Sequence, residues 1–460
     1  MSRAPGAIVS VFERLQQSYV LGKTKTYAWR KAQLEALQRM LSENEAAFVE
    51  ALNTDLGKSE AEAFTTEIGF LLSDIQHTKK HLRQWMKARK VSTPLVAQPA
   101  RSSLQPEPLG TVLIIGAWNY PVQLTLAPYV AALAAGNCAL LKPSELAPAS
   151  SALMASLIPK YLDGDAVAVV EGDKDVASEL LSLPFDHIFY TGGEAVGKIV
   201  MTAAAQNLTP VTLELGGKSP CVVDANTDIA TTARRIVWGK WTNAGQTCIA
   251  PDYVLVERSC ADALIDKLGK EITRQFGNQP LQSKDYGRIV NERHLARLKQ
   301  YTEGHEIVIG GQLDEAQMKL APTVILNPDI DTPVMQEEIF GPVLPVIEVS
   351  SVNEAIDFIK RRHKPLAAYL FSESQSIQQQ FVDEVSAGSV CINDTMMFMA
   401  NPQLPFGGVG NSGMGRYHGK FGFDTFSHLK SVMKRSFWFD VAIRYAPSSA
   451  RKRFLLKKLL

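Results

Sequence analysis

The chain has 460 residues, which is enough for roughly two or three domains and a sizeable hydrophobic core. Its 48 lysines and arginines are balanced by 47 aspartates and glutamates, so its charge gives no reason to expect nucleic acid or a strongly acidic partner. Hydrophobic residues make up 46% and charged residues 21%, a composition that excludes a disordered, collagen-like or disulfide-rich chain.

The cysteines indicate free thiols rather than a disulfide framework or a zinc site. Their number is odd, and no two of them form a C-x-x-C pair. They are Cys138, Cys221, Cys248, Cys260 and Cys391. We therefore expect a reducing compartment such as the cytoplasm. All of them except Cys248 are expected to fill the core.

No segment is typical of a secretory leader or of a membrane span. The first residues lack the apolar stretch of a signal peptide. The most apolar passage, residues 124–141, contains Pro128 and Asn137 and predicts a buried helix followed by a strand. Residues 451–460 combine five lysines and arginines with phenylalanine and leucines. This basic amphipathic tail predicts contact with an anionic membrane surface, the plainer alternative being a solvated or docked tail; it is too short to span.

In chain order, the pattern predicts helices first and then two α/β regions. Leu34, Leu37 and Leu41 recur at helical spacing within the first 90 residues, whereas the prolines of residues 91–109 predict an extended segment. Short apolar runs then alternate with stretches of helical length, as in a doubly wound sheet of buried parallel strands. The first runs are residues 111–115, 139–141, 166–170, 187–190, 211–215 and 221–223.

A second alternating region follows Asp224. It predicts helices over residues 229–241 and 261–275. Its predicted strands are residues 253–256, 322–326, 343–346, 366–371 and 389–392. We therefore expect two α/β domains that divide near residues 215–220.

Two residues are candidates for covalent chemistry. Cys248 ends a small, polar, glycine-containing loop, where a thiolate can act as a nucleophile, although a lone cysteine is more often inert. Glu214 ends a predicted strand beside Gly216 and Gly217, at the edge of a parallel sheet where ligands bind. It can serve as a general base, and the alternative is a carboxylate that caps the following turn.

Other candidates follow the neighbouring strands. Asn119 can donate a hydrogen bond to a developing oxyanion, and Lys142 with Glu145 can hold ribose hydroxyls. Residues 192–197 open a helix and let a pyrophosphate approach its N-terminus, although they are not G-x-G-x-x-G. Glu194 would oppose an anion there unless it points away. Each of these features alone is more often a turn than a site.

Taken together, the motifs resemble those of the NAD(P)-dependent aldehyde dehydrogenase superfamily. In the family's order they are Trp118-Asn119-Tyr120-Pro121, Lys142-Pro143-Ser144-Glu145, Glu214-Leu215-Gly216-Gly217-Lys218-Ser219-Pro220, Gly245-Gln246-Thr247-Cys248 and Glu337-Glu338-Ile339-Phe340-Gly341-Pro342. The resemblance covers about residues 10–435. Residues 405–415 and 426–428 resemble the class 3 branch, which includes fatty and aromatic aldehyde dehydrogenases.

The resemblance implies an α/β fold with a Rossmann-type cofactor domain, a second α/β catalytic domain and a small bridging and oligomerisation arm. We assign residues 1–90 and 110–214 to the NAD(P)-binding domain and residues 215–392 to the catalytic domain. Residues 91–109 and 393–440 are assigned to bridging and oligomerisation, and residues 441–460 to the tail. The branch also implies a homodimer, to which a strand near residues 432–437 contributes.

The resemblance further implies residue roles. Cys248 attacks the aldehyde, Asn119 and the N–H of Cys248 hold the oxyanion, and Glu214 activates the water that hydrolyses the thioester. Cofactor-binding roles carry over to Trp118, Lys142, Glu145, Gly192, Gly197, Glu338 and Phe340. Where the family usually has threonine or serine, this chain has Glu194, which puts the pyrophosphate contact in doubt. Because a carboxylate at Glu145 repels a 2′-phosphate, we expect NAD to be preferred and NADP to be accepted.

The expected substrates are medium- to long-chain aliphatic, aromatic or other apolar aldehydes. Candidates for an apolar tunnel are Phe64, Tyr120, Trp241, Met396, Met397 and Phe398, for which core packing is the alternative. A CoA-acylating enzyme is the second hypothesis, disfavoured because such relatives typically lack a glutamate at the position of Glu214. A non-catalytic protein that reuses the fold is the third. His77 and His81 lie four apart on a helix, but without H-E-x-x-H we expect no metal site.

Overall fold

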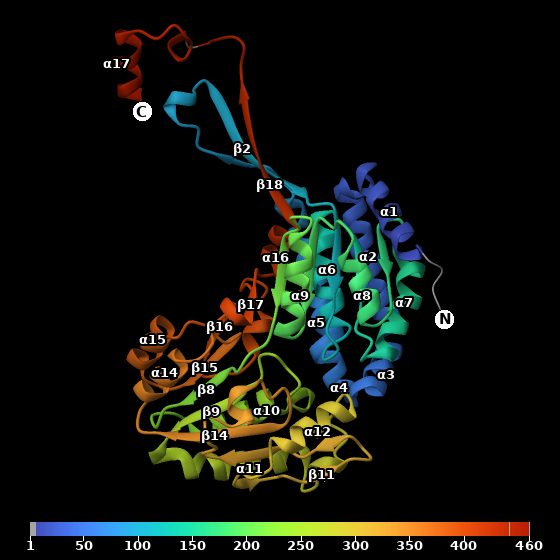
Figure 1. The fold of residues 1–460 in the computed structure, drawn as a ribbon, viewed down its shortest axis with the longest axis vertical. Coiled ribbons are helices and arrows are strands. Elements are labelled where there is room, and N and C mark those ends of the chain that lie inside the picture. Colours follow the sequence, from blue (N-terminus) through green and yellow to red (C-terminus); the bar gives the residue numbers. More distant parts are fainter. Residues whose placement is uncertain (1–5, 441, 460) are drawn as a thin grey trace.

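The computed structural model describes residues 6–440 and 442–459 of the chain. Two α/β layers lie one above the other, and a narrow arm projects from the first of them (Figure 1). The helices are α1 (Ala7–Val20), α2 (Tyr27–Glu43), α3 (Glu45–Leu56), α4 (Glu60–Ala63), α5 (Gly69–Trp85), α6 (Gln123–Ala135), α7 (Pro148–Tyr161), α8 (Lys174–Leu181), α9 (Glu194–Ala205), α10 (Ile229–Trp241), α11 (Ala261–Phe276), α12 (Glu292–Gln300), α13 (Pro333–Gln336), α14 (Val352–Lys360), α15 (Gln375–Glu384), α16 (Gly419–Thr425) and α17 (Ala450–Leu459). A π-helical segment, η2 (Phe64–Ile68), joins α4 to α5.

The first sheet is parallel apart from one edge strand. In spatial order its strands are β17 (Gly413–Met414), β7 (Val211–Glu214), β6 (His187–Thr191), β3 (Thr111–Ile115), β4 (Cys138–Lys142) and β5 (Val167–Val169). Only β17 runs antiparallel to its neighbour. Because successive side chains of a strand face opposite sides, Leu113 packs with α1, α8 and α9, while Val112 packs with α2, α5, α6 and α7. Both faces are buried, which explains the continuous apolar runs.

The second sheet is also mainly parallel. In spatial order it contains β10 (Ile307–Ile309), β13 (Thr323–Leu326), β14 (Val343–Val349), β9 (Tyr253–Glu257), β8 (Pro220–Val223), β15 (Ala367–Phe371) and β16 (Ser389–Ile392). Only β10 is antiparallel to its neighbour. A small ribbon of β11 (Leu313–Asp314) and β12 (Lys319–Leu320) lies outside it. The chain passes from the first sheet to the second between Glu214, which ends β7, and Pro220, which begins β8.

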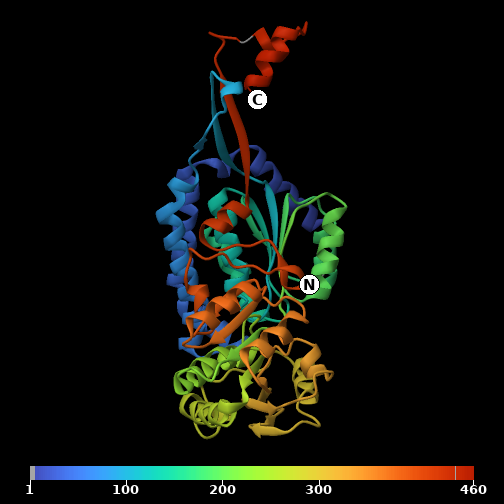
Figure 2. The ribbon, with the colours of Figure 1, turned by 90° about the vertical axis from the view of Figure 1, so that its left-hand side faces the viewer.

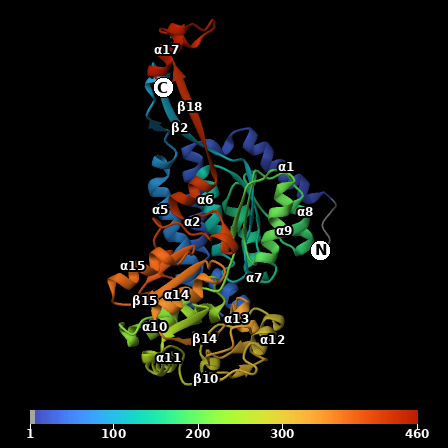
Figure 3. The same ribbon diagram turned by 60° about the vertical axis from the view of Figure 1, so that its left-hand side comes forward.

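The arm is a three-stranded antiparallel sheet of β1 (Arg89–Val91), β2 (Ala100–Pro108) and β18 (Ser427–Arg435). Figures 2 and 3 show it leaving the two larger layers, with α17 near its tip. The strand expected near residues 432–437 thus begins earlier, at Ser427, and pairs with β2 along its whole length.

The strands predicted between residues 111 and 392 are all present, and their ends differ by a few residues at most. The passage over residues 124–141 runs from α6 into β4, as expected. The segment 393–440, which the sequence assigns to bridging, also places β17 in the first sheet and packs α16 against α5 and α6. None of the helices described between residues 6 and 459 is long and apolar enough to cross a membrane.

Candidate active site

Two cavities meet where β7 leaves the first sheet. One has a volume of about 660 Å³ and the other about 450 Å³. Both are lined by Leu124, Thr191, Glu214, Leu215 and Cys248. The structure therefore brings the two residues singled out for covalent chemistry, Cys248 and Glu214, to the junction of the cavities.

Cys248 follows a tight loop that continues α10. The loop backbone is left-handed at Asn243, with a φ of 54°, at Ala244, with 51°, and at Gly245, with 77°. A Cβ at Gly245 would lie 2.2 Å from the carbonyl oxygen of Gly341, so only glycine fits. Burial raises the pKa of the Cys248 thiol well above its ordinary value, and nearby carboxylates add to the shift. The thiol therefore needs a base to become a nucleophile.

Hydrogen bonds from distant segments hold this loop. The N–H of Asn243 donates to Oε1 of Glu62 at 2.7 Å. The side-chain amide of Gln246 donates to the carbonyls of Asn243 and Arg288, and its Oε1 accepts from the N–H of Val290. A strained backbone conformation persists only where surrounding contacts hold it in place. These hydrogen bonds hold the left-handed residues of the loop.

Glu214 ends β7 with its side chain 3% exposed. Neither carboxylate oxygen accepts a hydrogen bond from any residue that the structure describes. Burial raises the pKa of Glu214 well above its ordinary value. An unpaired buried carboxylate with raised proton affinity, facing a cavity, is suited to take a proton from a thiol or from water.

Asn119 is held by hydrogen bonds to both its side-chain amide and its backbone carbonyl. Its Nδ2 donates to the carbonyl of Gln246 at 3.0 Å. Its own carbonyl accepts from Nζ of Lys58 at 3.1 Å and from Nδ2 of Asn243 at 2.7 Å. Lys58 forms a fully buried ion pair with Glu67 at 2.5 Å. Sequence reasoning missed this pair, since no motif or periodicity links Lys58, which precedes α4, to Glu67 in η2.

The smaller cavity carries the predicted cofactor residues on the first sheet. Trp118, Asn119, Lys142 and Glu145 line it. Nζ of Lys142, at the end of β4, donates to Glu145 at 3.0 Å. This places an ammonium and a carboxylate together at the carboxyl end of a parallel strand, where ribose hydroxyls can be held.

The second sheet's side of that cavity is formed by Glu338 and Phe340. Burial raises the pKa of Glu338 to about 8, and its Oε1 has no donor among the described residues. A Cβ at Gly216 would lie 2.3 Å from both carboxylate oxygens, so glycine is needed for this approach. The ring of Phe340 packs edge-on against Trp118 at 5.3 Å. An unpaired buried acceptor beside aromatic rings fits the ribose and ring of NAD(P).

The glycines and the acid of residues 192–197 separate in the structure. Gly192 and Gly193 line the smaller cavity at the start of α9. Gly197 does not line it; a Cβ there would lie 2.9 Å from Leu215, so packing accounts for this glycine. Glu194 is also outside the cavity lining, and its carboxylate bonds Lys198 at 2.7 Å and Asn411 at 3.3 Å. The charge that put an anion contact in doubt is therefore directed elsewhere.

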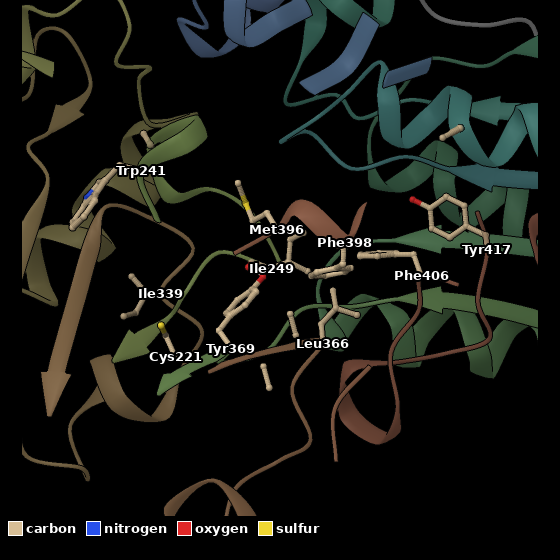
Figure 4. Close-up of a cluster of buried hydrophobic side chains, with 14 of the residues drawn as sticks. Cys221, Trp241, Ile249, Ile339, Leu366, Tyr369, Met396, Phe398, Phe406 and Tyr417 are labelled. Carbon is tan, nitrogen blue, oxygen red and sulfur yellow. Dashed lines mark hydrogen bonds between the residues drawn. The ribbon is translucent and has the colours of Figure 1, made fainter. Parts of the chain in front are cut away.

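The larger cavity is mostly apolar. Of the predicted tunnel residues, Tyr120, Trp241, Met396 and Met397 line it, but Phe64 and Phe398 do not. Figure 4 shows Phe398 packed beside Phe406, at a ring separation of 6.4 Å. The lining residues that sequence reasoning missed include Phe70, Trp238, Ile249, Phe276, Leu366, Phe406 and Tyr417. They come from segments far apart in the chain, which no local pattern can join.

The remaining candidates lie away from this centre. His77 and His81 face each other with ring centroids 4.3 Å apart, and His81 stacks on Trp85. Within residues 6–440 and 442–459, no cluster of three potential metal ligands occurs. Cys138, Cys221 and Cys260 are buried, and Cys391 is half-buried.

Comparison with known proteins accounts for this arrangement. The chain matches the aldehyde dehydrogenase family over residues 17–432. It is 47% identical to aldehyde dehydrogenase family 3 member H1 of Arabidopsis thaliana over 451 residues, 97% of this chain and 93% of that one. It is 46% identical to the dimeric NADP-preferring aldehyde dehydrogenase of Rattus norvegicus over 447 residues, 97% and 99% of the two chains.

A solved structure shares the fold throughout. The substrate-bound state of AldH from Staphylococcus aureus matches with a TM-score of 0.96 and 44% identity over 100% of both chains. With a family model that matches most of its length, and nearly half its residues shared with these aldehyde dehydrogenases, the chain belongs to the aldehyde dehydrogenase family, and it oxidises aldehydes with NAD(P).

Proposed function

We propose that Cys248, Glu214 and Asn119 carry out the reaction in the roles that their surroundings support. The observation that carries this is a buried carboxylate without a hydrogen-bond donor among the described residues, which lines the junction of two cavities together with a half-buried thiol. Glu214 takes the proton of the Cys248 thiol, and the thiolate sulfur forms a bond to the aldehyde carbon. The carbonyl oxygen becomes an alkoxide as its π bond breaks.

Hydrogen-bond donors stabilise that alkoxide. The Asn119 carboxamide has two N–H bonds, of which one donates to Gln246 and the other is available to the oxyanion. The backbone N–H of Cys248 is the second donor. A single donor of this kind is worth about 2.7–4 kcal/mol to the transition state. NAD(P)+, when bound in the smaller cavity, supplies the acceptor for the hydride of the aldehyde carbon.

Hydrolysis then completes the reaction. The acyl group is left as a thioester on Cys248, and the proton that Glu214 took from the thiol passes to solvent. The restored carboxylate then takes a proton from water, so that the hydroxide oxygen bonds the acyl carbon. The carbon–sulfur bond breaks, which releases the carboxylic acid and restores the thiolate. Because a base for water is present at this position, we favour hydrolysis over transfer to CoA.

The cofactor is held by residues from both sheets. Lys142 and Glu145 take the adenosine ribose, Glu338 takes the nicotinamide ribose, and Phe340 with Trp118 packs beside the ring. Gly192 lets the pyrophosphate approach the start of α9. We propose that NAD is preferred and NADP accepted, because the Glu145 carboxylate repels a 2′-phosphate while Lys142 offsets part of that repulsion.

The substrates we propose are medium- to long-chain aliphatic and apolar aromatic aldehydes. The apolar lining of the 660 Å³ cavity and its soft methionine wall at Met396 and Met397 support this class. The test is NADH formation by the purified protein across aliphatic aldehydes of increasing length and benzaldehyde, without CoA, beside a Cys248→Ala control. A dependence on added CoA, or turnover by the control, would contradict the mechanism.

We also propose that the protein forms a homodimer through the arm. β18 is an edge strand whose far side has no partner within the described residues, and Leu429 and Met433 on it are exposed. The rat relative is named as dimeric. Light scattering on a chromatography column tests the assembly: a mass near 101 kDa, twice the 50.5 kDa of one chain, is expected.

The C-terminal helix supports a peripheral membrane contact for an otherwise cytoplasmic enzyme. α17 carries the basic residues of the tail, and Phe454 and Leu455 on it are exposed. Sedimentation with vesicles tests the contact, which should appear with anionic vesicles and not with neutral ones. Equal partition to both kinds of vesicle would contradict an electrostatic tail.

A further inference from the structure

The acidic and basic side chains that line the larger cavity are all carboxylates among the described residues. Its lining includes the carboxylates of Glu62, Glu214 and Asp285. Among the described residues that line it there is no lysine, arginine or histidine. Glu214 belongs to the reacting centre, so the charges left to meet the rest of a substrate are Glu62 and Asp285.

Glu62 is fixed in place and half-buried. It lies in α4, where the side chain of Ser59 caps the helix and accepts from the N–H of Glu62 at 3.4 Å. Burial raises the pKa of Glu62, and two neighbours oppose that shift: the charge of Lys58, and the N–H of Asn243, which donates to Oε1 of Glu62 at 2.7 Å. The ionised form, which Asn243 and Lys58 favour, is therefore held at one place on the cavity wall rather than on a mobile surface side chain.

The nearby lysine does not neutralise this charge. Lys58 acts on Glu62 electrostatically, but its ammonium is in contact with Glu67 at 2.5 Å, and both of those side chains are fully buried. One positive charge thus serves two carboxylates, Glu62 and Glu67, and Asp285 adds a further negative charge. The local sum stays negative on the side of the cavity that Glu62 lines.

Burial separates the inner end of the cavity from its mouth. Trp241 and Tyr417 are 1% exposed and line its inner part, whereas Trp238 and Met397 are 39% and 49% exposed and form part of the rim. Glu62 is intermediate between these in exposure. Cys248 is half-buried as well, and it lines the same cavity as Glu62. The distal part of an aldehyde at Cys248 can therefore meet Glu62, where solvent screening is weaker than at the rim.

We propose that Glu62 selects aldehydes by the charge of their distal end: it favours a cationic group such as a quaternary ammonium and rejects a carboxylate. This inference rests on the proposed function and deepens it. The apolar walls bind the chain of the substrate, and a charge on its far end meets a carboxylate that has no free counter-ion beside it. Semialdehydes with a terminal carboxylate are the class that is excluded.

The size of the effect follows from Coulomb's law. Two charges about 6–8 Å apart at an effective dielectric constant of about 20 interact strongly enough to change binding by about 30- to 100-fold. Partial exposure of Glu62 reduces this, so we expect about tenfold for each sign of charge.

The experiment compares three aldehydes with the same carbon chain: hexanal, its ω-carboxylate, and its ω-trimethylammonium derivative, which cannot cyclise onto the aldehyde. NADH formation gives kcat/KM for the wild type, for Glu62→Gln and for Asp285→Asn. Glutamine keeps an oxygen that accepts from Asn243, so the variant removes the charge while leaving an acceptor for the loop. Hexanal turnover by the wild type tests the proposed function separately.

The ratio of kcat/KM for the ammonium aldehyde to that for the carboxylate aldehyde is the readout. We expect this ratio to exceed one in the wild type and to fall about 100-fold in Glu62→Gln, because the tenfold effects on the two charged aldehydes multiply. A smaller fall is expected in Asp285→Asn, because Asp285 is exposed. If Glu62→Gln changes all three aldehydes by the same factor, Glu62 acts only on the Asn243 loop and the inference is wrong. A wild-type ratio near one would overturn it as well.

Discussion

The buried ion pair of Lys58 and Glu67 makes a sharp test of how the active site is held. Nζ of Lys58 lies 2.5 Å from Oε1 of Glu67, and neither side chain is exposed. The same ammonium donates to the carbonyl of Asn119 and lies 3.9 Å from the ring centroid of Tyr120. The change we consider is Lys58→Met, which keeps the aliphatic stem and removes the charge.

The loss of stability can be worked out from this geometry. Removing one partner of a buried pair leaves an uncompensated charge and costs about 3–5 kcal/mol. Glu67 keeps two backbone donors, the N–H groups of Val122 and Gln123. Because these donors still stabilise its charge, we expect the loss of stability to lie toward the lower end of that range. At about 2.1 cal/mol/K per residue, the unfolding entropy of 460 residues is about 1 kcal/mol/K, so Tm falls by about 3–5 °C.

Catalysis should suffer as well, because Asn119 loses a donor to its carbonyl. A displacement of the order of 1 Å at a reacting group costs about 100-fold, so we expect kcat to fall by about 10- to 100-fold. Calorimetry and NADH formation measure the two effects. The double variant Lys58→Met/Glu67→Gln removes both charges and should recover about 2 kcal/mol of the lost stability.

Two results would refute this reasoning. A Lys58→Met protein that melts within 1 °C of the wild type and keeps its kcat would mean that the pair neither stabilises nor positions anything. A double variant that is less stable than Lys58→Met would mean that the cost does not arise from an unpaired charge at Glu67.

Four further outcomes are expected from the site. Glu214→Gln should lower kcat by about 10²–10⁴-fold, because neither the thiol nor water then has its base; kcat within a few-fold of the wild type would exclude Glu214 as the base. Because burial raises the pKa of Glu214 and only the carboxylate accepts a proton, the acid limb of the pH profile of kcat should lie above pH 4.5, and a limb at or below that value would contradict the burial argument. Glu145→Gln should raise the kcat/KM ratio of NADP to NAD by about tenfold by removing a like charge, whereas an unchanged ratio would place the 2′-phosphate elsewhere. Gly245→Ala should abolish NADH formation, since its Cβ would lie 2.2 Å from a backbone oxygen; normal activity would show that the loop yields, with circular dichroism as the check on folding.

Local sequence patterns were sufficient for the elements and for singling out residues that line the two cavities, among them Cys248, Glu214 and Asn119. Apolar runs such as residues 111–115 predict buried strands because both faces of a parallel sheet are covered by helices. Cys248, Glu214 and Asn119 lie in short motifs at strand ends or tight turns. In each motif, the residues that shape the backbone and the residue that carries the chemical group are only a few positions apart. Each of these signals spans a dozen residues or fewer, which is the range over which hydrophobic period and turn chemistry act.

The tertiary structure alone decided which side chains face one another. Lys58 and Glu67 pair, and both then reach the segment around residues 119–123, through contacts that no spacing encodes. The structure likewise turned Glu194 toward Lys198 and Asn411, packed Gly197 on Leu215, and left Phe64 and Phe398 outside the tunnel. These outcomes depend on the distance and direction between side chains far apart in the chain, which are set only when the two sheets and their helices pack together.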